Sequence, residues 1–315
     1  MGQQIFATNS LGGFFTNNQL SMQVRYKAQT DQKFRQFVDM ETMAGQNRGS
    51  KVFFDKVGNI STGGGTLLET ETIPKRNYTI LQGTLTMTEY GNSIPYTQKL
   101  KTLADIQVPE TIRTVLMNDM RVVLDSAAAT QFMTNDYIAT ITNTATTTFG
   151  TAGTAAATAG ANMSDKNVRD IIDQMKKAFI PRRSDGKYAC IASTNSIRGL
   201  YDFFEAKTQF TSMEPLMIGE VGTYYGSRFI EETNFLSNAK GSNGLYGEAC
   251  FFGADAVREG VAIPEEVRVA IPTDFGRDQG IAWYALLGFQ QVWSQSGVLN
   301  GQADGQTRII TVQSA

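Results

Sequence analysis

Residues 109–133 read PETIRTVLMNDMRVVLDSAAATQFM, and the architecture expected for the whole chain follows from this stretch. Pro109 suits the first turn of a helix, where its missing N–H is not needed. Apolar residues recur at helical spacing and predict one buried face: Ile112, Val115, Leu116, Val123, Leu124 and Ala127. A helix of this length is roughly 37 Å long. We therefore expect a structural spine around which the other parts of the 315-residue chain are arranged.

The segment before this helix, residues 45–100, has the character of β-strands. Residues 51–57 (KVFFDKV) are strand-like, and residues 59–65 (NISTGGG) suit a flexible turn. Further on, Leu85 and Met87 alternate with threonines, which is the period of a strand. We expect a long two-stranded hairpin, polar on both sides and poor in core residues. Such a hairpin is marginal alone and needs a partner to lie on.

The N-terminal region combines a polar composition with a modest positive charge. Residues 1–19 are rich in Gly, Asn, Gln and Thr, which favours an extended arm. Further on, four residues recur at intervals of about three to four, which predicts a helix there: Phe34, Phe37, Val38 and Glu41. Against the single acid Asp31, residues 1–38 carry a net charge of +3 from four basic residues: Arg25, Lys27, Lys33 and Arg35. These cations either lie against nucleic acid or form a solvated helix face.

Beyond the spine, the sequence changes twice. Residues 137–164 carry no charge, and 19 of the 23 residues at 140–162 are Thr, Ala or Gly, which predicts a surface loop or a flexible hairpin. A second helix follows, with Ser164 as its N-cap, Pro181 beyond its end, and one buried stripe: Val168, Ile171, Ile172, Met175 and Phe179. We then expect a buried strand at 187–192, a short helix at 196–204, and strands at 267–271, 281–293 and 308–312. This order predicts an α+β fold.

Composition excludes several kinds of chemistry. The chain has no His, so catalysis through Ser-His-Asp or Cys-His and zinc bound by His are absent. Cys190 and Cys250 stand 60 positions apart among apolar neighbours, which predicts buried free thiols. The net charge is −2, no apolar run is long enough for a membrane span, and the N-terminus lacks the features of a secretory signal.

Candidate ligand sites are equally few. Gly219, Gly222 and Gly226 lack the spacing of a dinucleotide loop and the Lys-Ser/Thr of a phosphate loop. Glu69 and Glu71 would share one face of a strand, but nothing converges on them. We expect no cofactor, no metal site and no enzyme. A hydrolase built on carboxylates from distant positions stays open as an alternative.

Several short segments carry a family resemblance through their order. Three precede the spine: Gly49-Ser-Lys-Val52, residues 68–74 (LETETIP) and Tyr90-Gly91. Three follow it: residues 188–195 (YACIASTN), residues 219–233 (GEVGTYYGSRFIEET) and Phe252-Gly253-Ala-Asp255. With this ordered set the chain resembles the major capsid proteins of tailed bacteriophages with the Hong Kong 97-type fold, and most closely a podophage-type subfamily. Ser193-Thr194 stands where that subfamily has a His-Pro turn.

The resemblance implies a division of the chain. Residues 1–44 would be the N-terminal arm, residues 45–100 the E-loop hairpin and residues 101–136 the spine helix of the P-domain. Residues 137–162 would be a Thr/Ala/Gly insertion, residues 163–265 the A-domain, and residues 266–315 strands that return to the P-domain. The implied function is a structural subunit of the icosahedral head, in the virion, assembled in the host cytoplasm into hexamers and pentamers around double-stranded DNA.

The same resemblance implies contact residues and partners. The E-loop residues expected to touch another subunit are Lys56, Asn59, Thr62, Gly64, Glu69, Glu71, Lys75 and Arg76. The arm residues expected to touch another subunit or face DNA are Arg25, Lys27, Lys33 and Arg35. Beyond copies of itself and non-specifically bound DNA, the expected partners are a portal, a cement or decoration protein and, because no long acidic or coiled-coil preamble is present, a separate scaffolding protein. No membrane is expected.

Some members of this family join an E-loop Lys covalently to an Asn of a neighbouring subunit. The expected tip here, residues 59–66, contains no Lys, and Lys56 and Lys75 would be solvated charges on the flanking strands. We therefore expect non-covalent shells. The structural alternatives are an encapsulin-like compartment and a tail-tube subunit.

Overall fold

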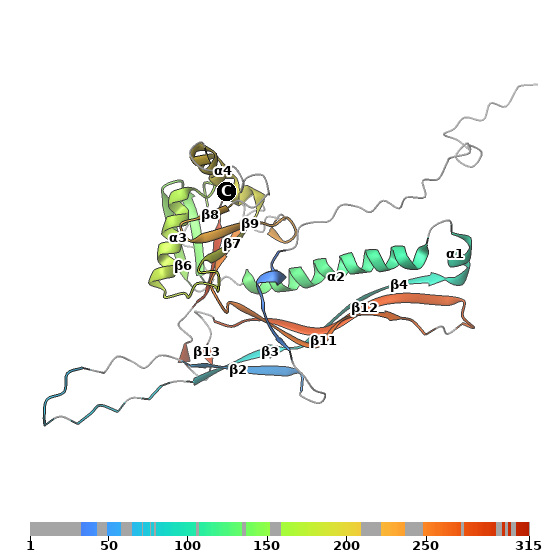
Figure 1. Cartoon of the computed structure of the whole chain (residues 1–315), viewed down its shortest axis with the longest axis horizontal. Helices are drawn as coiled ribbons and strands as arrows, with labels where there is room; N and C mark the ends of the chain where they lie inside the picture. The colour runs from blue at the N-terminus through green and yellow to red at the C-terminus, as the bar shows by residue number, and fades with distance from the viewer. Residues whose placement is uncertain are drawn as a thin grey trace, which may run out of the picture.

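The structure is a computed structural model, and the part of the chain that it describes comprises residues 33–42, 49–57, 65–70, 72–75, 77–78, 80–104, 107–133, 137–151, 159–208, 222–236, 248–271, 274–293, 298–299, 302–303 and 307–314. The molecule is elongated, with a long helix and long strands running to one end and a hairpin pointing to the other (Figure 1). A second body of helices and strands stands beside their junction. The α+β class expected from the sequence is confirmed.

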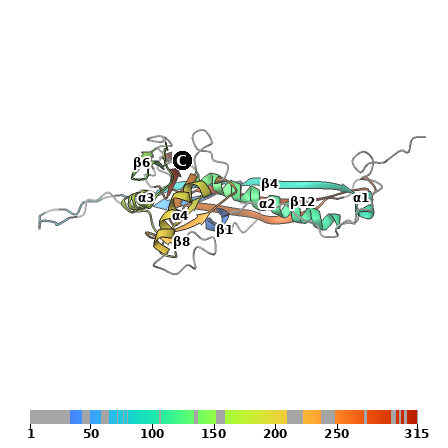
Figure 2. The ribbon, with the colours of Figure 1, turned by 90° about the horizontal axis from the view of Figure 1, so that it is seen from above.

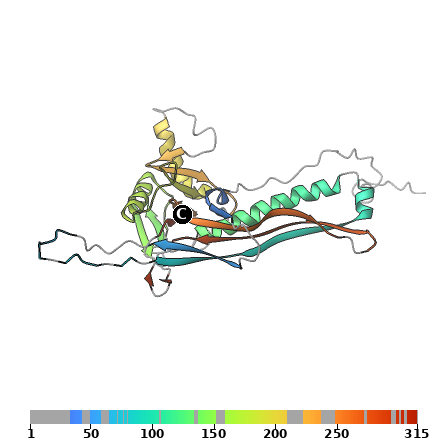
Figure 3. The same ribbon diagram turned by 60° about the horizontal axis from the view of Figure 1, so that its bottom comes forward.

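Helix α2 (Val108–Phe132) is the predicted spine, and it lies along a sheet of four strands. The sheet order is β1-β11-β12-β4, with bounds Asp39–Thr42, Val257–Val269, Asp278–Gln291 and Thr88–Thr97. Leu116 and Leu124 of the helix lie in one core with Trp283 of β12. The Trp283 indole N–H also donates to Asp119 Oδ2 at 3.0 Å, which ties sheet to helix. A short helix, α1 (Gln98–Leu103), closes the far end (Figure 3).

The second body is built on a sheet of seven strands in the order β6-β5-β15-β10-β7-β9-β8. Their bounds are Thr146–Thr151, Tyr137–Asn143, Ile309–Gln313, Glu248–Phe252, Tyr188–Ala192, Ser227–Glu231 and Gly222–Tyr224. Alternate residues of β10 face two cores: Phe251 lies with helix α3 (Asp165–Lys177), and Phe252 lies with α2. This sheet therefore links the two halves of the molecule. Helix α4 (Thr194–Thr208) belongs to the same body (Figure 2).

A hairpin of β2 (Lys51–Val57) and β3 (Ile80–Thr86) leaves the junction of the two bodies. A pair of two-residue strands, β13 (Val298–Leu299) and β14 (Gln302–Ala303), lies nearby. The hairpin is narrower than predicted, because residues 88–97 form β4 and pair with β12 instead. It is also not polar on both sides: Val52, Phe54 and Leu85 are buried in a small core with Val292.

The second predicted helix is confirmed as α3, with one change. Ser164 caps its start, and the Ser164 hydroxyl accepts a hydrogen bond from the Asn167 N–H at 3.4 Å in a capping box. Val168, Ile171, Ile172 and Met175 are fully buried. Phe179, predicted in the same stripe, lies beyond the helix and is exposed. Along α2, Val115 is likewise exposed and not part of the buried face.

The predicted helix across residues 34–41 is wrong. Only Arg35–Phe37 form a 3-10 turn, and Asp39–Thr42 form β1, which pairs in parallel with β11. The partner strand lies more than 200 residues away, so local spacing carries no sign of it. Residues 1–32 lie outside the described part of the chain.

Three expected boundaries also change. Residues 137–143 are not part of an added loop, because β5 is an inner strand of the seven-stranded sheet, with Ala139 and Ile141 fully buried. The boundary at residue 265 falls inside β11, whose whole length belongs to the four-stranded sheet. Not all of 266–315 returns to the spine, since β15 pairs with β10 and β5 of the seven-stranded sheet.

Candidate assembly surfaces

The hairpin β2–β3 has one buried face and one exposed face. Its inner face is buried, whereas Phe53, Val57 and Ile80 on its outer face are exposed. The described residues beyond the strands continue the exposed surface, with Leu68 and Ile73 both 70% exposed. A folded monomer gains nothing from large apolar side chains in water, so this surface suits contact with another chain.

Lys56 of β2 lies on the buried face and only 5% of its surface is exposed. Its ammonium lies 5.5 Å from the ring centre of Trp293 and 5.8 Å from that of Phe54. Cations at these distances are attracted to the ring faces. The predictions of an intersubunit contact and of a solvated strand charge are therefore wrong for Lys56, which packs within its own chain.

The other predicted E-loop contacts divide into two groups. Glu69 and Lys75 are exposed, as a contact residue of an isolated subunit should be, but neither lies in a strand. The remaining predicted residues fall outside the described part of the chain: Asn59, Thr62, Gly64, Glu71 and Arg76.

Arg35 is tied into its own fold. Its guanidinium lies 2.6 Å from Glu259 Oε1 and also pairs with Glu265, both on β11. Its backbone N–H donates to Asp125 Oδ1 of α2 at 3.0 Å. A cation with two carboxylate partners is poorly available to DNA phosphates, which argues against the DNA-facing role expected for Arg35; the expected contact with another subunit stays a prediction. Lys33 is half-buried at the start of the same turn. Arg25 and Lys27 lie outside the described residues.

Two buried carboxylates hold the polypeptide around α2. Burial raises the pKa of Asp125, although backbone N–H groups of residues 33–35 donate to it and partly offset the rise. Burial also raises the pKa of Glu232, and Asp125 adds repulsion. Glu232 accepts hydrogen bonds from the N–H groups of Asn234, Phe235 and Leu236 at 2.6, 2.8 and 2.9 Å. These acids anchor loops through backbone N–H groups.

The end of the molecule opposite the hairpin is also apolar. Leu100 and Leu103 of α1 are exposed there, together with Val269 and Ile271 beside the β11–β12 turn. The turn itself closes with a hydrogen bond from the Arg277 N–H to the Asp274 carbonyl oxygen at 2.8 Å. Its tip, Phe275, is fully exposed. This surface could not be predicted from the sequence, because residues 272–277 lie between strands and carry no periodic apolar pattern.

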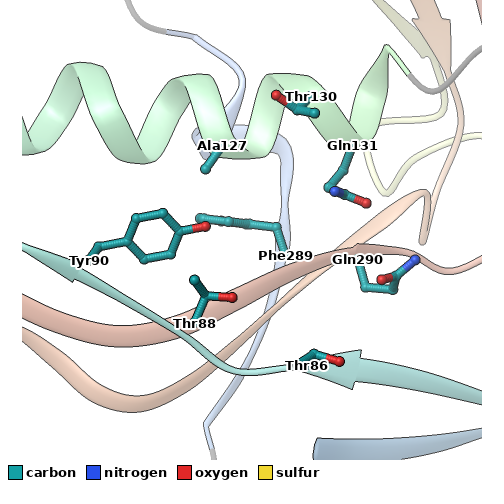
Figure 4. Close-up of a pocket in the computed structure, with 8 residues that line it drawn as sticks. All are labelled: Thr86, Thr88, Tyr90, Ala127, Thr130, Gln131, Phe289 and Gln290. Carbon is teal, nitrogen blue, oxygen red and sulfur yellow. The ribbon is translucent and has the colours of Figure 1, made fainter.

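A cavity of about 300 Å³ lies between α2 and the strands where β3 passes into β4 (Figure 4). Thr86, Thr88 and Tyr90 line one side, Ala127, Thr130 and Gln131 of α2 the other, and Phe289 and Gln290 its floor. Burial raises the pKa of Tyr90. No lining residue carries a charge, so the cavity offers neither a general acid–base pair nor a ligand set for a metal.

The remaining chemistry is equally sparse. No group of three or more His, Cys, Asp and Glu that could hold a metal occurs in the described parts of the chain. Cys190 and Cys250 are buried and free, as predicted, and burial raises the pKa of both thiols. A thiol held in its protonated form is a poor nucleophile and a poor metal ligand. Among the described helices, none is long and apolar enough to cross a membrane.

Comparison with known proteins gives matches in structure alone. No protein-family model matches the chain, and no curated protein matches its sequence. The acidic stable capsid of Helicobacter pylori bacteriophage KHP30 superposes with a TM-score of 0.70 at 14% identity, covering 99% of each chain. The head of Helicobacter pylori bacteriophage KHP40 gives 0.69 at 14% identity, covering 100% of this chain and 99% of that one. A chain of Mycobacterium phage Che8 gives 0.67 at 12%, covering 95% and 97%.

These likenesses cover both partners almost from end to end, so they concern the whole architecture and not one shared motif. The chain has the fold of the capsid proteins of tailed phages. More particularly, it is the Hong Kong 97-type fold expected from the ordered sequence segments, with its spine helix, long sheet, hairpin and second body.

Proposed function

We propose that this chain is the structural subunit of the icosahedral head of a tailed bacteriophage, and that copies of it form hexamers and pentamers around double-stranded DNA. The observation that carries the proposal is the end-to-end likeness to phage capsid chains, at 99% of both chains for KHP30. The protein would be a virion component, assembled in the host cytoplasm, of the podophage-type subfamily.

Two exposed apolar surfaces at opposite ends of the molecule support this function. One lies on the hairpin with Leu68 and Ile73, and the other at the far turn with Phe275. An elongated subunit with an apolar surface at each end is suited to repeated contacts with copies of itself. Area spread over many such contacts stabilises an assembly without unusual chemistry at any residue.

We assign the proposed roles to regions that follow the observed strands and helices. The E-loop would be β2–β3 with the residues between them, the P-domain α2 with the four-stranded sheet, and the A-domain the seven-stranded sheet with α3 and α4. The arm would end at the 3-10 turn, where Arg35 anchors it. The proposed partners are other copies of the chain, packaged DNA, a portal, a separate scaffolding protein and a cement protein.

Electron microscopy of the purified full-length chain tests the proposal, with and without co-expressed candidate scaffolding proteins from the same genome. Closed icosahedral shells are expected. Tubes would support the tail-tube alternative, and shells filled with a protein cargo would support an encapsulin-like compartment. Monodisperse small particles with hydrolase activity under every condition would overturn the proposal.

A further inference from the structure

Phe179 occupies an unusual position just after helix α3. The Ile180 N–H donates to the Met175 carbonyl oxygen at 3.1 Å, and the Phe179 N–H donates to the Lys176 carbonyl oxygen at 3.0 Å. Phe179 itself has a φ of 55°. The hydrogen bond from Ile180 reaches back five residues to Met175, and Phe179 between them has a left-handed backbone. This combination is typical of a helix end at which glycine is the favoured residue.

A phenylalanine here is costly in two ways. The left-handed conformation crowds any side chain that has a Cβ, and the Phe179 ring is 85% exposed to water. Its own fold therefore gains little from the ring. A glycine would serve the helix end better, and an exposed ring of this kind is suited to contact with another molecule.

A second aromatic residue stands next to this helix end. Tyr225, in the turn between β8 and β9, also has a left-handed backbone, with a φ of 49°. The Lys176 ammonium lies 4.3 Å from its ring centre, and its hydroxyl donates to Asp173 Oδ1 at 3.3 Å. Since Lys176 and Asp173 both belong to α3, the turn between β8 and β9 packs against the C-terminal part of this helix.

The segment that leads from this helix end to β7 is rich in basic residues. Residues 176–187 (KKAFIPRRSDGK) contain five basic residues and the single acid Asp185, within a chain whose net charge is −2. Some of the cations already have partners: Lys176 pairs with Asp173 at 3.2 Å, and Arg183 donates to the Phe37 carbonyl oxygen at 3.2 Å. Lys177 and Arg182, which precede and follow Phe179 in the sequence, are exposed, and the Arg182 guanidinium lies 5.7 Å from the ring centre of Tyr188.

We propose that Lys177, Phe179, Arg182 and Tyr225 form a docking surface, the Phe179 surface, for an acidic segment of a second protein that carries an apolar side chain. Lys177 and Arg182 supply charge for carboxylates, and the two rings supply an apolar anchor. Aromatic residues and Arg are the side chains that dominate protein interfaces. Nucleic acid is the less favoured partner, because an exposed phenylalanine offers nothing to a phosphate backbone.

The proposal goes beyond the head-subunit function, since the surface lies at α3 and not on the hairpin or the far turn. Fluorescence anisotropy of the unassembled full-length chain tests it with three probes. The first is a short labelled peptide in which leucine alternates with glutamate. The second has lysine in place of glutamate, and the third is a short duplex DNA. Only the acidic peptide should bind, and its affinity should fall with added salt.

Phe179→Gly is the decisive variant, because it suits the helix end while removing the ring. It should weaken acidic-peptide binding about tenfold without lowering the melting temperature. The double variant Lys177→Glu, Arg182→Glu should abolish binding. Phe275→Gly is the matched control: Phe275 is also fully exposed, with a φ of 46°, but lies at the far end of the molecule. It should leave binding unchanged.

Four outcomes would overturn the proposal. One is failure of the acidic peptide to bind wild type, and another is equal weakening by Phe275→Gly. A third is preference for the DNA probe, which would assign the surface to nucleic acid. The fourth is loss of shells in Phe179→Gly with no peptide binding by wild type, which would make the surface a contact between copies. Peptide binding and shell formation are measured in separate assays. A negative result for the docking surface can therefore be distinguished from a negative result for the head-subunit function.

Discussion

A Cβ atom built on Gly288 would lie 2.2 Å from the carbonyl oxygen of Thr86, so the end of β3 passes directly against β12. Gly288 pairs across the sheet with Gly260 of β11, where a Cβ would lie 2.8 Å from side-chain carbons of Leu85 and Met87. These two paired glycines thus form the part of the four-stranded sheet that the hairpin contacts where it crosses. Their missing side chains set how closely, and at what angle, the hairpin lies.

Gly288→Ala should therefore displace the hairpin. The added methyl group meets backbone, which yields less easily than a side chain, so we expect a loss of about 1–3 kcal/mol in the free energy of unfolding. Urea unfolding of the purified chain measures it. Gly65→Ala is the control, because no atom outside its neighbouring residues lies within 4 Å of its Cβ position. Equal stability of the two variants would show that the close crossing does not constrain the hairpin.

Lys56→Ala should destabilise the chain although it removes a charge. Its aliphatic stem is buried, and its ammonium faces Trp293, whose ring centre also lies 4.4 Å from the Arg308 guanidinium. Losing the buried stem and the cation–ring contact should cost about 1–2 kcal/mol. Lys75→Ala on the exposed part of the hairpin should stay within about 0.5 kcal/mol of wild type. Thermal unfolding of both variants decides whether Lys56 holds the hairpin.

Sequence reasoning was most successful where the signal was local. The spine at 108–132 and helix α3 follow from apolar spacing, a proline in the first turn and the Ser164 cap, all within one segment. The buried strand β7 follows from an unbroken apolar run. The Hong Kong 97-type fold followed from the order of several segments and not from any one of them.

The errors concern contacts between distant segments. Strand β1 exists because Asp39–Thr42 pair with residues 258–261, and no local pattern reports that. Lys56 is buried because Trp293, at the end of β12, reaches the inner face of the hairpin. The threonine-, alanine- and glycine-rich composition of 140–162 concealed the core strand at its start, where Ile138 and Ile141 are buried and the strand pairs with β15. The surface residues Phe275 and Phe179 could not be predicted as exposed, because the exposure of a side chain depends on the folded structure and not on the local sequence.

Asp125→Asn should change how stability depends on pH. Burial raises the pKa of Asp125 in the folded chain, so the folded state holds that proton more tightly than the unfolded state does. Its stabilising contribution is fully present below the ordinary pKa of an aspartate and is lost as the pH rises through the raised value. Between pH 7 and pH 4, wild type should therefore gain stability relative to Asp125→Asn.

Urea midpoints at pH 7, 5.5 and 4 measure this difference. Glu110→Gln, which removes an exposed carboxylate at the start of the same helix, is the matched control. A constant gap between wild type and Asp125→Asn across the range would contradict the role assigned to burial at this carboxylate.

The exposed hairpin residues should matter for assembly and not for folding. Leu68→Ser combined with Ile73→Ser removes two apolar side chains that are each 70% exposed, so the isolated chain should unfold within about 0.5 kcal/mol of wild type. Shell yield, measured by sedimentation and electron microscopy, should fall sharply. Val115→Ser, on the exposed face of α2, is a matched control that should assemble normally. Normal shells from the double variant would remove the hairpin from the proposed contacts.

Mature particles should hold together without covalent links between subunits. A Lys–Asn bond needs an accessible lysine near the loop tip and an asparagine from another copy. It also needs a carboxylate that accepts the proton at a site with little water. Lys56 does not meet the first condition, because only 5% of its surface is exposed and its ammonium packs on Trp293. Lys75 is exposed, but it lies outside the expected loop tip at residues 59–66 and in no strand. Boiled, SDS-denatured particles should therefore run as one band near 34.5 kDa. A ladder of multimers that persists under reducing conditions would refute this expectation, and its disappearance in Lys75→Arg would identify Lys75 as the residue responsible.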